Sequence, residues 1–273
     1  MKPCLLKLLM MLFVVVSSAL LCACKAIVNK LAFYPDNIHV IPAIALPEEI
    51  QALSTDTDDD ITITSLFLPA HDSDKLVIYF HGNGGNIYGR LPSLIQLRNF
   101  GFNVIGAGYR GYGQNEGEPS EDGLYLDGKT VFDFAINELG FLPENIVILG
   151  RSIGTTVAIN TAQYQEIAGL ILVTPLTSGK AHAELGIFRF VSWLAGDAFN
   201  NLDKIKHVKA PVLIIHGNQD HVIPYFMGEE IYHAAVSKKT LVTIDGAGHN
   251  DLHDVYGQQY WSSIFDFLHT AWK

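Results

Sequence analysis

The stretch LGRSIGTT (residues 149–156) places Ser152 between two glycines directly after an apolar run. Residues 146–149 have the composition of a strand that is buried on both faces, and residues 155–164 favour a helix. A Gly-x-Ser-x-Gly sequence between a strand and a helix is typical of a sharp turn that presents the serine hydroxyl at the end of the strand, and the glycines allow the close approach that this turn requires. Because the motif is short enough to occur by chance, the rest of the sequence must supply partners for the serine.

Apolar runs and helical patterns alternate along the rest of the chain. Continuous runs rich in Val and Ile predict strands buried in a parallel sheet at residues 76–80, 102–105, 170–173 and 212–215. A more polar last strand is expected at 240–244, and period-two alternation predicts an edge strand at 61–68. Helices are expected at 121–140, 224–236 and 256–272. This alternation predicts one α/β domain with a mostly parallel central sheet flanked by helices.

A serine hydroxyl is a weak nucleophile and needs a base. Among the eleven histidines, His249 lies in the glycine-rich loop DGAGHND, just after the last predicted strand. This position allows its imidazole to reach back over the end of the sheet. The sequence therefore favours His249 as the base, whereas His39, His71 and His207 have ordinary surroundings for partly exposed side chains.

The base needs a carboxylate that fixes its tautomer. Asp220 ends PVLIIHGNQD, a predicted buried strand followed by a tight loop, so its carboxylate emerges at the same end of the sheet. Asp245 and Asp251 are close to His249 in sequence, which does not by itself make them good orienting groups. The preceding strand is followed by Thr174, which has no carboxylate. We therefore predict Ser152, Asp220 and His249 as the catalytic residues.

The tetrahedral intermediate of acyl transfer needs two preorganised N–H donors. One candidate is the N–H of Ile153, next to the serine. The other is the N–H of Asn83, in the glycine-rich segment YFHGNGGN that follows the strand at 76–80. Glycine-rich loops also bind phosphate, but this loop has neither a Walker lysine nor a complete G-x-G-x-x-G opening.

Composition excludes some classes of function. The formal net charge is −10 and no Lys/Arg cluster is present, which argues against binding to nucleic acid. Four carboxylates gather within residues 56–60, a pattern that predicts a solvated loop more readily than a metal site.

The N-terminus has the features of an export signal. Lys2 and Lys7 accompany an apolar segment, residues 8–23, that is too short for a helix across about 30 Å of hydrocarbon. It ends in LCAC (residues 21–24), which resembles the bacterial lipobox and implies cleavage before Cys24 and lipid attachment to that residue. The alternative is an uncleaved signal anchor.

The three cysteines all lie in or at the end of this segment, so we expect no disulfide in the domain. The predicted organisation is a lipoprotein-type signal peptide (1–23), a membrane-proximal tether (24–37) and one catalytic domain (38–273). Attachment through Cys24 predicts a bacterial cell-envelope protein, and Lys25, with no Asp retention signal, favours the outer membrane.

Six ordered motifs resemble the α/β-hydrolase superfamily over nearly the whole chain after residue 30: YFHGNGGN, YRGYG, EGEPSEDG, GRSIG, PVLIIHGNQD and GAGHND. The chain is most similar to serine aminopeptidase-like hydrolases, a group that includes membrane-bound protein depalmitoylases of eukaryotes. The resemblance implies an α/β-hydrolase fold and acyl hydrolysis, and it implies neither a metal nor a cofactor. The order Ser152, Asp220, His249 is the order of α/β hydrolases.

The sequence departs from the family pattern at three positions. Gly108 stands where the family usually has Asp, Asn115 stands where it usually has Ser, and Thr155 replaces a glycine that often follows the nucleophile turn. A lid is expected at residues 174–208, too short for a large cap domain, which predicts an open site. The aromatic residues within 187–194 either line an acyl groove or pack on the sheet.

These features predict a serine hydrolase that cleaves ester or thioester bonds through an acyl-enzyme, with a small-molecule or lipidated acyl substrate. Two alternatives remain at this stage. One is a peptidase that uses the same three residues, and the other is a non-catalytic envelope lipoprotein that retains the scaffold. The sequence does not predict an oligomeric state.

Overall fold

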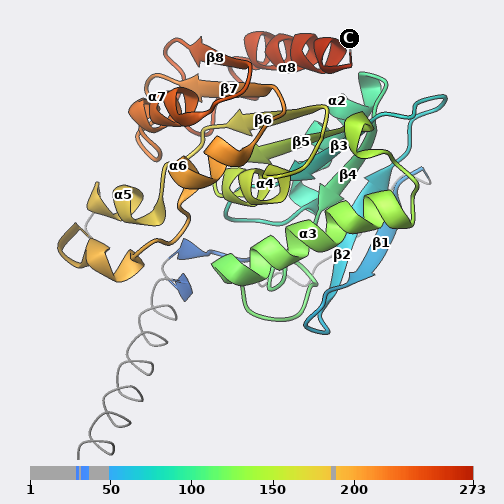
Figure 1. Cartoon of the computed structure of the whole chain (residues 1–273), viewed down its shortest axis with the longest axis horizontal. Coiled ribbons are helices and arrows are strands. Elements are labelled where there is room, and N and C mark those ends of the chain that lie inside the picture. The colour runs from blue at the N-terminus through green and yellow to red at the C-terminus, as the bar shows by residue number, and fades with distance from the viewer. Residues whose placement is uncertain (1–28, 31, 37–48, 186–188, 273) are drawn as a thin grey trace, which may run out of the picture.

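The computed structural model describes residues 29–30, 32–36, 49–185 and 189–272 (Figure 1). The strands of this part form one eight-stranded sheet in the order β1-β2-β4-β3-β5-β6-β7-β8. β1 and β2 run antiparallel to their neighbours, and the strands from β4 to β8 run parallel. The strands are β1 (Gln51–Asp56), β2 (Thr62–Leu68), β3 (Leu76–Phe80), β4 (Asn103–Ala107), β5 (Ile146–Arg151), β6 (Gly169–Val173), β7 (Val212–Gly217) and β8 (Lys239–Ile244).

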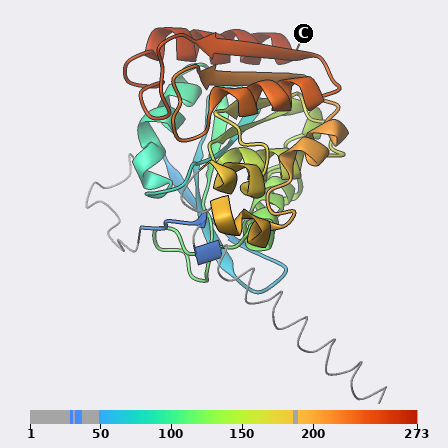
Figure 2. The same ribbon diagram turned by 90° about the vertical axis from the view of Figure 1, so that its left-hand side faces the viewer.

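Helices cover both faces of the sheet, as Figures 1 and 2 show from two directions. α3 (Glu121–Asn137), α4 (Gly154–Ala162) and α7 (Tyr225–Ala234) pack on one face. α2 (Leu91–Asn99) and α8 (Gly257–Ala271) pack on the other. Along β3, Ile78 belongs to the first core cluster, and Val77 and Tyr79 belong to the second. Burial on both faces explains the uninterrupted apolar runs of the parallel strands.

The predicted fold class is confirmed, and all six predicted parallel strands are present. The expectation that residues 61–68 form an edge strand is wrong, because β1 lies outside β2 and pairs with it from Gln51 to Asp56. β1 has only one buried residue, Thr55, so its sequence carries no clear apolar alternation. Helix α2 was also not predicted. Its hydrophobic signal is weak, since it buries only Leu94 and Leu97.

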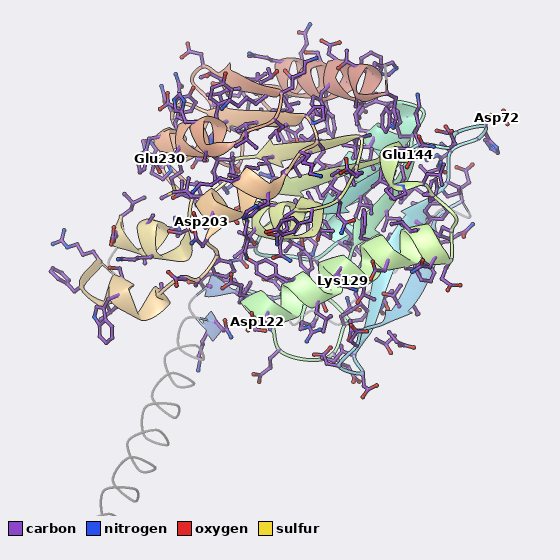
Figure 3. All side chains as sticks on the ribbon, viewed as in Figure 1. Asp72, Asp122, Lys129, Glu144, Asp203 and Glu230 are labelled. Carbon is purple, nitrogen blue, oxygen red and sulfur yellow. The ribbon has the colours of Figure 1, made fainter. Side chains whose placement is uncertain are left out.

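Charged side chains lie on the outer surface of the domain. Figure 3 labels Lys129 on α3, Glu144 within the 3-10 helix η2 (Pro143–Asn145) and Glu230 on α7, and all three residues are exposed. Among the helices that the structure describes, none is long and apolar enough to cross a membrane. The predicted signal peptide (1–23) and Cys24 lie outside the described residues.

Short helices connect β6 to β7 in the segment predicted as a lid. They are α5 (Gly179–Glu184), η3 (Arg189–Ala195), α6 (Asn201–Lys204) and η4 (Ile205–His207). Phe190 is 77% exposed and Trp193 is 65% exposed, so these two side chains do not pack on the sheet. The short lid contributes no large cap over the described part of the domain.

Residues 32–36, which fall within the predicted membrane-proximal tether (24–37), lie against the domain. Phe33 is only 4% exposed and belongs to the core cluster on the α3–α4 face. Its ring packs edge-on against Phe199, with the centroids 5.8 Å apart. The blue segment lies beside the yellow and orange lid helices in both views (Figures 1 and 2). The packed part of the chain therefore begins before residue 38.

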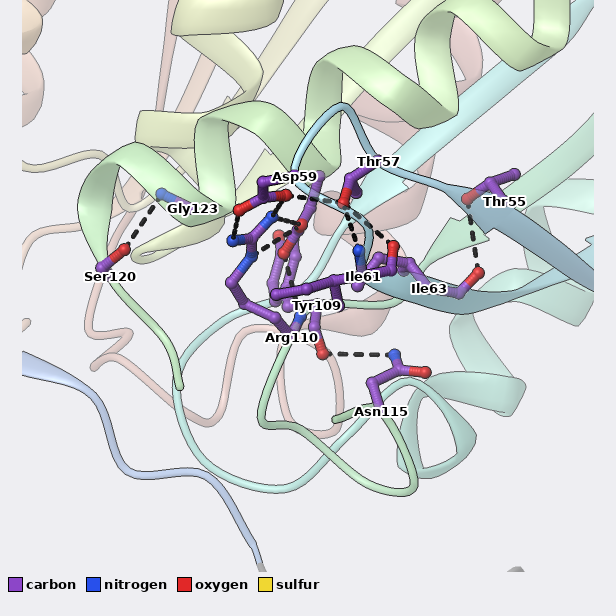
Figure 4. A network of polar contacts seen from close by, with 11 residues as sticks. Thr55, Thr57, Asp59, Ile61, Ile63, Tyr109, Arg110, Asn115, Ser120 and Gly123 are labelled. Carbon is purple, nitrogen blue, oxygen red and sulfur yellow. Dashed lines mark hydrogen bonds and ion pairs between the residues drawn. The ribbon is translucent and has the colours of Figure 1, made fainter. Parts of the chain in front are cut away.

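An ion-pair network joins the β1–β2 turn to α3 (Figure 4). The buried guanidinium of Arg110 donates to Asp127 Oδ1 at 2.8 and 2.9 Å and to Asp59 Oδ2 at 2.6 Å. The hydrogen bond from Arg110 lowers the pKa of Asp59 to about 2, whereas burial raises the pKa of Asp127. The acidic stretch 56–60 thus supplies a partner for a buried arginine. Nowhere in the described residues do three or more His, Cys, Asp or Glu side chains gather as a metal site requires.

Candidate active site

Ser152 occupies the turn between β5 and α4. Its φ of 54° lies in the left-handed region that residues other than glycine rarely adopt. The Ser152 N–H donates to Val173 O at the end of β6 (2.9 Å), and the Ser152 carbonyl accepts from the N–H (2.9 Å) and the hydroxyl (2.6 Å) of Thr155. Thr155 is fully buried, and its hydroxyl bond to the Ser152 carbonyl shows that this departure from the family pattern braces the turn.

The glycines on both sides of Ser152 are required by close packing. A Cβ at Gly154 would lie 2.3 Å from the carbonyl oxygen of Phe80, and a Cβ at Gly150 would lie 2.5 Å from the carbonyl oxygen of Gly154. Both contacts involve backbone atoms, which cannot rotate away. The turn therefore fits tightly between β3 and α4, as its sequence predicts.

The structure brings the three predicted catalytic side chains together at the carboxyl ends of the strands. His249, in the loop after β8, lies with Nε2 3.1 Å from Ser152 Oγ. Its Nδ1 lies 2.7 Å from Oδ2 of Asp220, in the loop after β7. These distances are hydrogen-bond distances, and they form one continuous path from hydroxyl to imidazole to carboxylate.

Asp220 is buried and held by backbone donors. Its Oδ1 accepts from the N–H groups of Val222 and Ile223, both at 2.8 Å. Burial opposes ionisation of this carboxyl, but hydrogen bonds from His216 and His249 outweigh it and hold its pKa well below the usual range. Asp220 is therefore a carboxylate at neutral pH, the form that stabilises an imidazolium.

His216 contacts the carboxylate and was not predicted as part of the site. It is completely buried at the end of β7, with Nε2 2.8 Å from Ile223 O and 3.4 Å from Asp220 Oδ2. Its other nitrogen faces Gly228, where a Cβ would lie only 2.4 Å away. The available signal was the spacing of four residues between His216 and Asp220, both after the same buried run.

The loop that carries His249 is held from two sides. Arg151, the residue before the serine, donates to the carbonyl of His249 at 3.2 Å. Asp251 accepts from the Gly248 N–H at 2.8 Å. Asp245, the other acid close in sequence, accepts from the side chain of Asn218. Asp245 and Asp251 therefore have structural partners of their own, and Asp220 is the carboxylate on the imidazole.

The two predicted N–H donors flank the serine. Ile153 stands at the start of α4, where the helix dipole favours negative charge. A Cβ at Gly82 would lie 3.3 Å from Ser152 Cβ, so the loop with Asn83 runs directly beside the nucleophile. Neither the Asn83 N–H nor the Ile153 N–H donates to a backbone carbonyl within the described ranges.

Two tyrosines of the YRGYG motif brace the loop at residues 81–86, hereafter the oxyanion loop. The hydroxyl of Tyr109 donates to His81 O at 3.2 Å, and that of Tyr112 donates to Asn83 Oδ1 at 2.8 Å. Burial lowers the pKa of His81 to about 4, and its Nδ1 lies 2.8 Å from Gly82 O. His81 is therefore neutral at pH 7 and bonded within its own loop.

The departures at Gly108 and Asn115 compensate each other. A Cβ at Gly108 would lie 2.1 Å from Thr64 O and 2.6 Å from Asn115 Nδ2, so no larger residue fits. Asn115 Oδ1 accepts from the Thr64 N–H at 2.8 Å, and its Nδ2 donates to Tyr109 O at 3.2 Å. The amide fills the space beside Gly108 and ties the YRGYG motif to β2.

Comparison with known proteins identifies the family. Residues 71–203 match the model described as "Serine aminopeptidase, S33". The α/β-hydrolase domain-containing protein 17B of Homo sapiens is 34% identical over 214 residues, covering 77% of this chain and 73% of that protein. The chain belongs to the α/β-hydrolase family. The α/β-hydrolase domain-containing protein aho-3 of Caenorhabditis elegans is 32% identical to this α/β hydrolase over 88% of the chain and 78% of that protein.

Solved structures confirm the fold of this α/β hydrolase. An esterase of Pyrococcus furiosus superposes with a TM-score of 0.75 at 21% identity, covering 87% of this chain and 97% of the esterase. An α/β hydrolase of Vibrio vulnificus superposes with a TM-score of 0.70 at 23% identity, covering 89% and 92% of the two chains.

Proposed function

We propose that this α/β hydrolase is a serine hydrolase that cleaves ester or thioester bonds of acyl groups. The observation that carries the proposal is the hydrogen-bonded path from Ser152 through His249 to Asp220, with Ser152 at a positive φ. Its relation to a solved esterase supports acyl substrates. The resemblance of its motifs to those of protein depalmitoylases makes lipidated proteins one candidate class of substrate.

The chemistry follows from the geometry. Nε2 of His249 accepts the proton of Ser152 Oγ as the oxygen attacks the acyl carbonyl, and Asp220 stabilises the imidazolium that forms. The N–H groups of Asn83 and Ile153 donate to the oxyanion. His249 then protonates the leaving alcohol or thiol, which departs and leaves an ester on Ser152. Water, activated by the same imidazole, hydrolyses this acyl-enzyme and regenerates the serine.

A panel of substrates tests this proposal. The purified full-length chain is assayed with acyl esters and acyl thioesters of graded chain length, and Ser152→Ala is assayed at the same concentration. We expect hydrolysis by the wild type and a loss of at least about 10³-fold in Ser152→Ala. Equal rates for the two proteins, or no hydrolysis by folded wild type across the panel, would contradict the proposal and favour a non-catalytic role.

A peptidase is the second candidate, favoured by the family model described as a serine aminopeptidase. The same groups perform amide hydrolysis, with His249 protonating the leaving amine. Aminoacyl amides added to the panel separate the two candidates. The proposed function predicts faster cleavage of esters and thioesters than of amides with the same acyl group, by a margin larger than their intrinsic difference in reactivity.

We further propose that Cys24 carries a lipid that anchors the protein in a bacterial cell envelope, with the outer membrane as the expected destination. The support is the LCAC sequence after the apolar segment 8–23. Metabolic labelling with an alkyne fatty acid tests it: the wild type should incorporate the label and Cys24→Ser should not. Incorporation that is unchanged in Cys24→Ser would contradict the assignment.

A further inference from the structure

Residues 32–36, the N-terminal segment, bond directly to the oxyanion loop. Asn83 Nδ2 donates to Ala32 O at 2.6 Å, and Asn83 Oδ1 accepts from the Tyr34 N–H at 2.8 Å. The same Oδ1 accepts from the Tyr112 hydroxyl at 2.8 Å. An asparagine side chain offers two donors and one acceptor oxygen, so most of its capacity is used to join these segments.

A second contact lies three residues further along the same loop. Asn86 Nδ2 faces the carboxylate of Asp36, at 3.0 and 3.2 Å from its two oxygens. Asn86 Oδ1 accepts from the Tyr88 N–H at 3.0 Å, which ties it to the start of η1 (Tyr88–Arg90). The N-terminal segment therefore holds the oxyanion loop at both Asn83 and Asn86.

The oxyanion loop has little internal structure that would hold it without such contacts. Gly84 and Gly85 both have positive φ, at 75° and 66°. Glycines in this region lose much conformational freedom on ordering, so the loop needs outside partners to keep one conformation. Apart from the N-terminal segment, side-chain support comes from Tyr109, from Tyr112 and from Arg90, which donates to Gly84 O at 2.8 Å.

The N-terminal segment is itself fixed by Phe33. This side chain is buried in the core and packs against Phe199, whose N–H donates to Glu121 at the start of α3. The neighbouring Tyr34 differs, because its side chain is 61% exposed and only its backbone N–H reaches Asn83. One buried aromatic ring thus seats the segment that bonds to the loop.

We propose that the N-terminal segment is a positioning element for the oxyanion site: Phe33 seats residues 32–36, which hold the Asn83 N–H where the substrate oxyanion forms. This inference rests on the proposed function, since it assigns a role in acyl transfer to Asn83. Losing one such donor outright lowers kcat by about 10²–10³-fold in a serine hydrolase, so a displaced donor should cost less than that.

Kinetics of the full-length chain test the proposal with variants in the segment. The concentration of active sites is titrated first, and kcat is calculated per active site. Phe33→Ala should then lower kcat for a soluble acyl ester about 10-fold and leave KM within about 2-fold. The reason is that the displaced N–H donor would stabilise the transition state less well, with little effect on the bound substrate. A trifluoromethyl ketone, which binds as a tetrahedral oxyanion, should lose affinity by a similar factor. Phe33→Leu, which retains an apolar side chain, should recover most of the loss.

Tyr34→Ala is the matched control, since it removes an aromatic side chain from the adjacent position and keeps the backbone donor. We expect its kcat and ketone affinity to equal those of the wild type. A purely structural role for Phe33 would lower the melting temperature but leave kcat per active site unchanged. Folded Phe33→Ala with kcat and ketone affinity within 2-fold of Tyr34→Ala would overturn the proposal.

Asp36→Ala decides the question if Phe33→Ala does not fold. It removes the contact to Asn86 at a half-buried position outside the core, and we expect kcat to fall about 3-fold with KM unchanged, as the loss of one modest hydrogen bond would produce. An unchanged kcat would overturn the positioning role. A wild type without Ser152-dependent hydrolysis would instead refute the proposed function, so the two failures are distinguishable in one assay.

Discussion

The two sides of the site are held in different ways. On the nucleophile side, Ser152 is fixed by its neighbours: its N–H bonds to Val173 O, Thr155 bonds to its carbonyl, and tight packing surrounds Gly154. On the other side, the oxyanion loop bonds to side chains and backbone far away in sequence, such as Tyr112, 29 residues from Asn83.

The two sides therefore depend on the rest of the chain to different degrees. The nucleophile turn is encoded by a short motif, because its glycines and the bracing Thr155 lie within a few positions of Ser152. Its distant contacts, Val173 O and Phe80 O, are backbone atoms of the two strands beside β5. A glycine-rich loop is adaptable and close to the substrate, but its conformation depends on partners elsewhere in the chain. We therefore expect variants on the two sides to differ in kind, with large direct losses at the nucleophile side and graded losses at the loop.

The largest effect is expected at Asp220. Asp220→Asn keeps the size of the side chain but removes the carboxylate that fixes the imidazole tautomer, and kcat should fall about 10⁴-fold. Steady-state kinetics on the folded variant measure this. A loss of less than 10-fold would mean that the hydrogen bond from His249 to Asp220 has little part in the reaction. It would also contradict the expectation that losses are larger on the nucleophile side than at the oxyanion loop.

A large loss of stability is expected at Arg110, which lies in the motif that braces the oxyanion loop. Arg110→Met leaves Asp127 buried without its partner, which should lower the free energy of unfolding by about 3–5 kcal/mol. Asp59→Asn breaks the other pair of the same guanidinium, but the Asp59 side chain is 47% exposed, and solvent screening limits the loss to about 1 kcal/mol or less. Denaturant unfolding measures the free energy of unfolding of both variants. Similar losses of stability in the two variants would contradict the prediction that the buried Arg110–Asp127 pair matters more than the exposed Arg110–Asp59 pair.

A graded loss is expected at Tyr112. Tyr112→Phe removes the hydroxyl that donates to Asn83 Oδ1, a hydrogen bond with a net contribution of about 1 kcal/mol, so kcat should fall about 5-fold with little change in KM. Tyr125→Phe is the control, because its hydroxyl bonds to Glu121 at the start of α3. An equal effect of the two variants on kcat would show that the bond to Asn83 has no special role.

The smallest effect concerns pH. The pKa of Asp220 in the folded state lies below its ordinary value of 3.8, so its ionised form contributes stability that is present above about pH 4 and is lost as the pH falls through the folded-state pKa. The difference in free energy of unfolding between the wild type and Asp220→Asn should therefore shrink below pH 4. Urea unfolding at pH 3 and pH 6 measures it, and a constant difference would contradict the shift.

Sequence reasoning reached the features that are local. Ser152, Asp220 and His249 each follow a short apolar run in a distinctive loop, and parallel strands bring such loops to one end of the sheet. His216 was missed although it lies in one of these motifs, because its spacing of four residues from Asp220 does not by itself reveal a contact between the two side chains. Five of the six parallel strands, β3 to β7, were predicted because burial on both faces leaves uninterrupted apolar runs, whereas β8 is more polar and only partly buried.

The features that were missed depend on contacts between distant residues. β1 forms through its pairing with β2 and carries no apolar pattern of its own. The N-terminal segment is too short to show any hydrophobic periodicity. Its sequence therefore could not distinguish a segment that packs on the domain through Phe33 from an unpacked tether. The sequence also could not show that Gly108 and Asn115 belong together. Their relation depends on Thr64 O, which lies where a Cβ at position 108 would be.

The central claim is that Ser152, activated by His249, forms a covalent bond to an electrophilic centre. Intact-mass spectrometry after incubation with a fluorophosphonate tests it most directly. The account predicts one adduct on wild type, mapped to Ser152 by peptide analysis, no adduct on Ser152→Ala and strongly slowed labelling of His249→Ala. Equal labelling of Ser152→Ala and wild type, or labelling at another residue, would contradict it.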